Sequence, residues 1–202
     1  MAQVLETEPR IYHYLRATCG VAVHVLCLSF TVFIAALARP GSSLFSWHPF
    51  LMTLAKFSHK SKARYHWILQ CLCVACAGLG LAAISYNKHL NGKPHFSTWH
   101  GLVGLLAACG VAAQSAGGLP LLYHRLVKGW SLARLKRYHA VSGLLAYLLG
   151  SSSLMLGMCS LWFTASVHGA SWYLVAACPV LSALFIMSQV TNAYMAKKAL
   201  RP

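Results

Sequence analysis

Three histidines stand directly before three long apolar runs, and little else in the sequence could do chemistry. They are His66, His100 and His139. Each run has about the 20 residues that a helix needs to cross a bilayer. The runs cover residues 67–86, 101–123 and 140–163. Because successive spans run in opposite directions, we expect His66 and His139 near one membrane face at similar depth, and His100 near the other.

Two histidines at matched depth on different helices can hold a flat iron macrocycle, a haem, from both sides. At the second face His48 is the only well-placed partner for His100. Haem iron held by two imidazoles has no open position, so it passes electrons and does not activate substrates. Gly104 and Gly143 follow His100 and His139 by four residues, on the same helix face. We expect each glycine to clear room beside its histidine.

The composition is that of an integral membrane protein. Of 202 residues, 58% are hydrophobic and 9% charged, and the mean hydropathy is +0.59. A soluble domain carries roughly a quarter charged residues. The only acidic residues are Glu6 and Glu8, which excludes paired-carboxylate catalysis, carboxylate calcium sites and acid-lined pores. The net charge of +15 does not indicate nucleic-acid binding, because the basic residues lie in short loops between apolar runs.

The sequence predicts one all-α membrane domain over residues 1–202, a helical bundle with five full spans and a truncated second helix. The apolar stretch that begins at Pro49 has only seven residues, 49–55, before a cluster of cations, and seven residues cover about a third of the bilayer core. The cations are Lys56, Lys60, Lys62 and Arg64. The full spans are predicted at 17–38, 67–86, 101–123, 140–163 and 172–194, and the truncated helix at 48–55.

Charge predicts the orientation of the second half of the chain. The loops before His66 and His139, together with the C-terminal tail, hold twelve of the seventeen Lys and Arg residues, which predicts that they are cytoplasmic. The first half is ambiguous. With a second span, the N-terminus is cytoplasmic. Without one, the N-terminus lies outside, and His48 falls on the cytoplasmic side, where it cannot pair with His100.

Cations beside His66 and His139 suggest a place for an anionic reductant. Arg64, two residues before His66, is the best single candidate, and Lys60 and Arg137 are further candidate substrate-binding residues. His89 is a candidate contact for a substrate at the opposite face. For most of these cations, a role in setting membrane topology is the simpler interpretation.

Four motifs resemble the cytochrome b561 family over almost the whole chain. The spacings from His66 to His100 (i to i+34) and from His100 to His139 (i to i+39) also fit this family. The motifs are Ser46-Trp47-His48-Pro49-Phe50-Leu51-Met52, Arg64-Tyr65-His66-Trp67, His100-Gly101-Leu102-Val103-Gly104 and Lys136-Arg137-Tyr138-His139-Ala140-Val141-Ser142-Gly143.

The resemblance implies six helices, of which the central four hold two b-type haems, one near each face. By the family pattern His66 pairs with His139, and His48 pairs with His100. Electrons would pass from cytoplasmic ascorbate to monodehydroascorbate radical or ferric iron across the membrane. The resemblance further implies an endoplasmic reticulum or cytoplasmic vesicle membrane. A homodimer is left open.

The chain departs from the family between His48 and His66, which stand at positions i and i+18 where the family has a full span and a loop. About 20 residues, the length of one span, are missing after Ala55. The alternative to a transmembrane reductase is therefore a truncated isoform that holds a single haem or is non-functional. A third class is a histidine-lined carrier of divalent metal, which the absence of carboxylates after Glu8 disfavours.

Overall fold

The computed structural model describes residues 10–54, 63–127 and 129–199, which form helices joined by short turns. Five of the helices are long and apolar enough to cross a membrane. The prediction of a helical bundle with five full spans and a short second helix is confirmed. The elements are α1 (Arg10–Ala38), α2 (Leu44–Leu54), α3 (Ala63–Leu90), α4 (Trp99–Leu122), the 3-10 turn η2 (His124–Leu126), α5 (Leu132–Met158), α6 (Leu161–Thr164) and α7 (Ala170–Ala199).

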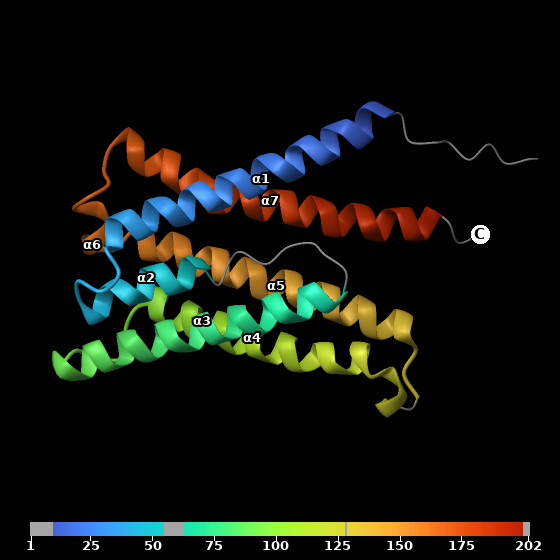
Figure 1. The fold of residues 1–202 in the computed structure, drawn as a ribbon, viewed down its shortest axis with the longest axis horizontal. Helices are drawn as coiled ribbons and strands as arrows, with labels where there is room; N and C mark the ends of the chain where they lie inside the picture. Colours follow the sequence, from blue (N-terminus) through green and yellow to red (C-terminus); the bar gives the residue numbers. More distant parts are fainter. Residues whose placement is uncertain (1–9, 55–62, 128, 200–202) are drawn as a thin grey trace, which may run out of the picture.

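The long helices lie roughly side by side and alternate in direction (Figure 1). We call the end at which α1, α3 and α5 begin the basic end, because it carries Arg125, Arg134, Lys136 and Arg137. At the far end α2, α4 and α7 begin. The 11 residues of α2 extend about 16 Å, roughly half of a membrane. Helix α1 begins at the basic end and runs to the far end, where α2 follows it. His48, in α2, therefore lies at the same end as His100, although α2 is short.

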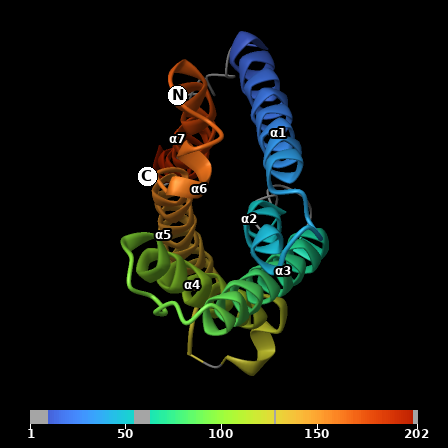
Figure 2. The same ribbon diagram turned by 90° about the vertical axis from the view of Figure 1, so that its left-hand side faces the viewer.

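The six larger helices form a closed ring when viewed along their length (Figure 2). Each packs against the next in the order α1, α2, α3, α4, α5, α7 and back to α1. A buried apolar cluster joins α1, α5, α6 and α7 toward the far end, and it contains Phe30, Ile34, Met158, Phe163, Val167 and Ala176. The polar side chains of the candidate site lie in the other half of the ring, on α2, α3, α4 and α5.

Helix caps explain where α4 and α5 begin. Thr98 Oγ1 accepts a hydrogen bond from the Gly101 backbone N–H, and Ser131 Oγ accepts one from the Arg134 backbone N–H. Such N-caps satisfy backbone donors that a helix start leaves free. His100 is therefore in the first turn of α4, whereas α5 begins eight residues before the predicted span at 140. Charged residues can extend a helix beyond the bilayer, and hydropathy does not detect that extension.

The predicted span 140–163 is wrong at its far end. Helix α5 ends at Met158, and α6 is a separate short helix whose Phe163 is buried with 1% of its surface exposed. The indole N–H of Trp172 donates to the Met158 carbonyl over 2.9 Å and so helps to satisfy this helix end. Apolar residues that pack across the end of a bundle cannot be distinguished by hydropathy from those that continue a span.

Candidate functional site

The structure brings His66 and His139 together at the basic end. Their ring centroids are 6.2 Å apart and the ring planes meet at 89°. His66 lies in the first turn of α3 and is exposed, while His139 lies two turns into α5 and is half-buried.

His48 and His100 form a second pair at the far end, with ring centroids 6.0 Å apart and planes at 76°. Nδ1 of His48 lies 3.1 Å from the Gly80 carbonyl oxygen, and Nδ1 of His100 lies 2.8 Å from that of Ser153. Because a carbonyl only accepts, Nδ1 of each ring carries the proton and donates. This leaves Nε2 of each ring as a free electron pair, which is the state that a metal-ligating imidazole needs.

Both pairs have the separation that two imidazoles need in order to hold one iron atom. An imidazole nitrogen binds a first-row metal at about 2 Å, which puts the two ring centroids roughly 6 Å apart across the metal. The observed separations of 6.2 and 6.0 Å match this value. The Nδ1 bonds to backbone carbonyls also fix the ring orientation at the far end, as outer partners of ligand histidines do.

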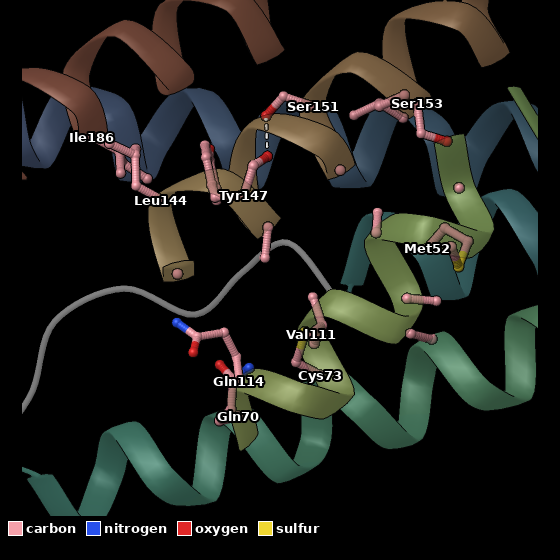
Figure 3. Close-up of a pocket in the computed structure, with 18 of the residues that line it drawn as sticks. Met52, Gln70, Cys73, Val111, Gln114, Leu144, Tyr147, Ser151, Ser153 and Ile186 are labelled. Atoms are coloured by element: carbon pink, nitrogen blue, oxygen red, sulfur yellow. Dashed lines mark hydrogen bonds between the residues drawn. The ribbon is translucent and has the colours of Figure 1, made fainter. Parts of the chain in front are cut away.

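One cavity of about 350 Å³ lies between the helices and is lined by His66 and His139 at one end and by His100 at the other. Its volume is within the range of ligand pockets, about 300–1,000 Å³. In Figure 3, Gln70 and Gln114 lie at one end of the cavity, and Ser153 and Met52 lie at the other. Small side chains make the room on α4 and α5, where Gly104, Ala107, Ala108, Gly143, Ala146 and Gly150 line the wall.

Gly104 and Gly143 line this cavity together with His100 and His139. A Cβ at Gly104 would lie 2.9 Å from Ser153 Oγ, and one at Gly143 would lie 2.5 Å from Gln114 Nε2. Besides lining the cavity, these glycines therefore make room for polar side chains of the facing helix.

The glycines that face the imidazoles are Gly157 and Gly118. A Cβ at Gly157 would lie 3.0 Å from Cε1 of His100, and one at Gly118 would lie 3.6 Å from Cε1 of His139. Sequence reasoning missed these contacts because i+4 spacing describes one helix, whereas the imidazoles extend onto the neighbouring one.

The predicted substrate-binding residues are spread over both ends. Arg137 is exposed on α5 at the basic end, and Arg64 is the second residue of α3 at that end. Lys60 lies outside the described residues. His89 is exposed near the last turn of α3, at the far end. Within the described ranges, no group of three or more His, Cys, Asp or Glu side chains could hold a bare metal ion.

The sequence profile of eukaryotic cytochrome b561 matches residues 30–164. The chain belongs to the cytochrome b561 family. This family binds haem b, and the two histidine pairs and the cavity between them fit such a group. No solved structure matches the chain.

Curated members of the cytochrome b561 family are similar over the full length. The chain is 52% identical to "Transmembrane reductase CYB561D2" of Homo sapiens and 50% identical to that of Bos taurus, each over 222 positions that cover all of both chains. It is 40% identical to "Probable transmembrane reductase CYB561D1" of Homo sapiens over 95% of this chain and 92% of that one. The chain is thus a multi-pass membrane protein of an oxidoreductase family.

These alignments also agree with a deletion. An alignment of 222 positions that covers all 202 residues of this chain includes at least 20 positions where it has no residue. That number agrees with the deficit of about 20 residues predicted from the sequence.

Proposed function

We propose that this protein is a haem-b transmembrane oxidoreductase that passes electrons from cytoplasmic ascorbate to monodehydroascorbate radical or ferric iron on the other side. The observation that carries the proposal is the pair of ring separations, 6.2 Å for His66 with His139 and 6.0 Å for His48 with His100. By the resemblance, the membrane is that of the endoplasmic reticulum or of cytoplasmic vesicles.

The basic end receives the electron in this proposal. Haem b held by two imidazoles supplies one-electron redox chemistry with no open coordination position. The exposed His66 borders this end, and the cations there, Arg137 among them, attract an anionic donor. Ascorbate loses one electron and one proton there and becomes the monodehydroascorbate radical. Because the chain has no acidic residue after Glu8 and the Lys and Arg side chains are already protonated, water takes the proton.

The far end delivers the electron. His48 and His100 are held by carbonyls of Gly80 and Ser153, and the cavity joins their end of the bundle to the other pair. One electron reduces ferric iron to ferrous iron, or a monodehydroascorbate radical, with a proton, to ascorbate. His89, exposed at this end, is a candidate contact for the acceptor.

The test is haem per chain in purified protein, together with the reduced-minus-oxidised spectrum after ascorbate is added. We expect two haems per chain, both reducible. His66→Ala or His139→Ala removes one, and His48→Ala or His100→Ala removes the other. His168→Ala is the matched control, since His168 is exposed and lies outside both pairs.

Because α2 is short, a second candidate function is that of a single-haem isoform without transmembrane electron transfer. One haem per chain, unaffected by His48→Ala, would favour that alternative. A protein that binds no haem would overturn both. In vesicles loaded with ferric iron, external ascorbate reduces the enclosed iron only if electrons cross the whole membrane. This measurement therefore distinguishes transmembrane electron transfer from reduction of a haem alone.

A further inference from the structure

Helices α4 and α5 carry the same set of site residues at the same spacing. His100 is followed by Gly104, Gln114 and Gly118 at positions i+4, i+14 and i+18. His139 is followed at the same three positions by a glycine, a serine and a glycine, namely Gly143, Ser153 and Gly157. Because the two helices run in opposite directions and pack together, each residue of one set faces a residue of the other.

The polar residue of each helix contacts the ligand histidine of the other. Gln114 Nε2 on α4 donates to the His139 carbonyl over 2.6 Å, and Ser153 Oγ on α5 donates to the His100 carbonyl over 3.2 Å. A helix carbonyl at position i lies beside residue i+4. An outside donor therefore reaches this carbonyl closely only where residue i+4 has no side chain.

Gly143 and Gly104 are these i+4 residues, and we call them the glycine notches. An added Cβ would lie 2.5 Å from Gln114 Nε2 in the first notch and 2.9 Å from Ser153 Oγ in the second. Real Cβ atoms essentially never approach other atoms within 3.0 Å. A side chain at either glycine would thus force the polar side chain from the opposite helix to leave its present position.

We propose that Gln114 and Ser153 are positioning residues, each of which enters a glycine notch and fixes the haem-ligand histidine of the neighbouring helix. This inference rests on the proposed function. It is strongest for His139, whose Nδ1 is buried without a hydrogen-bond partner among the residues that the structure describes, so that the ring lacks the carbonyl contact that holds His100. The Gln114 bond to the His139 backbone keeps the register of α4 against α5 at this pair.

Helices α2 and α3 carry the same arrangement at the far end. Met52, four residues after His48, contacts Gly80, fourteen residues after His66, with the Met52 Sδ atom 3.2 Å from a Cβ added at Gly80. The reciprocal contact for His66 would need a helical residue fourteen positions after His48. That position, residue 62, lies outside the residues that the structure describes. His66 itself is exposed.

The test compares Gln114→Leu with Ser153→Ala in the holoprotein and follows each haem by its low-spin electron paramagnetic resonance signal and its midpoint potential. Gln114→Leu is expected to change the signal and potential of the haem at His66 and His139 only. Ser153→Ala is expected to change those of the other haem only. Unchanged signals in both variants, or equal changes at both haems, would overturn the proposal.

A second measurement does not need haem. Gly143→Ala should lower the thermal unfolding midpoint of the apoprotein, and adding Gln114→Ala should restore it, because the new Cβ then fills the space of the lost amide. Gly78→Ala is the matched control, since Gly78 is a helical glycine with nothing within 4 Å, and its midpoint should not fall. If Gly143→Ala behaves like Gly78→Ala, the notch has no role. If wild-type protein binds no haem but Gln114→Ala still restores the unfolding midpoint of Gly143→Ala, the proposed function fails while the contact between Gln114 and the notch at Gly143 is confirmed.

Discussion

The imidazole of His48 faces that of His100 with ring centroids 6.0 Å apart, although His48 stands on a helix of 11 residues. Two contacts with α3 hold it there. The Gly80 carbonyl accepts a hydrogen bond from Nδ1 of His48. Because Gly80 has no side chain, Leu51 and Met52 of α2 pack closely against its backbone. The part of α2 that carries His48 is therefore packed on α3 although the helix is short.

Gly80→Ala should weaken the far-end pair. The added Cβ would lie 3.2 Å from Met52 Sδ and 3.3 Å from Leu51 Cβ, so α2 must move away from α3 and take His48 with it. Overpacking of this kind costs about 1–3 kcal/mol. On heating, we expect one haem absorption to be lost earlier than in wild type while the haem at His66 and His139 keeps its transition. Simultaneous loss of both haems at the wild-type temperature would contradict this prediction.

Gly157→Ala should change the haem held by His100. Its Cβ would lie 3.0 Å from Cε1 of that ring, whereas a Cβ at Gly118 would have 3.6 Å to Cε1 of His139. The first distance forces the imidazole to shift and the second is an ordinary contact. Gly157→Ala is expected to change the midpoint potential of one haem or to release it, and Gly118→Ala to leave both spectra as in wild type. Equal effects of the two variants would show that the imidazole position is not set by this glycine.

Arg137→Gln should raise the ascorbate concentration that gives half-maximal haem reduction, without changing the haem content. Loss of one charge-assisted contact with an anion costs about 1.4 kcal/mol, which corresponds to about a tenfold higher half-saturating ascorbate concentration. Arg137→Lys keeps the charge and should behave closer to wild type. The measurement is the initial rate of haem reduction against ascorbate concentration. The difference should shrink at high salt, because screening weakens the attraction for exposed charges.

Phe163→Ala should be the most destabilising single change in the apolar cluster. Its ring is 1% exposed and contributes to the packing between α1, α5 and α7. Removing a buried aromatic ring costs about 3–5 kcal/mol. Leu161→Ala in the same short helix is the control, since that side chain is 88% exposed, and it should stay within about 0.5 kcal/mol of wild type. The free energies of unfolding of both variants can be measured by unfolding in detergent, monitored by circular dichroism.

The sequence was sufficient to predict the helical class, the number of full spans and the short second helix, because hydropathy and charge record bilayer crossing directly. Alternating helix direction predicted that His66 and His139 lie at one end, whereas the pairing of His48 with His100 came from the family resemblance, because the short second helix left the end of His48 open. The haem itself and the substrate residues remain predictions.

Other features depended on how each helix is rotated toward its neighbours, which one helix's own periodicity does not record. The contacts of Gly104 and Gly143 with the facing helix, and those of Gly157 and Gly118 with the imidazoles, were therefore not predicted. Gln114 and Ser153 had a signal in the sequence, namely the shared i+4, i+14 and i+18 pattern after His100 and His139. The pattern is hard to detect because the polar residue at i+14 is a glutamine in one helix and a serine in the other.

The length of α2 also bears on how the protein is made. A helix of 11 residues is too short to partition into a bilayer as a unit, whereas the five long helices can each enter as they are synthesised. Helix α2 must instead be recruited by helices that are already in place, through its packing on α3 and the bond from His48 to Gly80. We therefore expect the far-end pair to be completed by folding inside the membrane, after the long helices have been inserted.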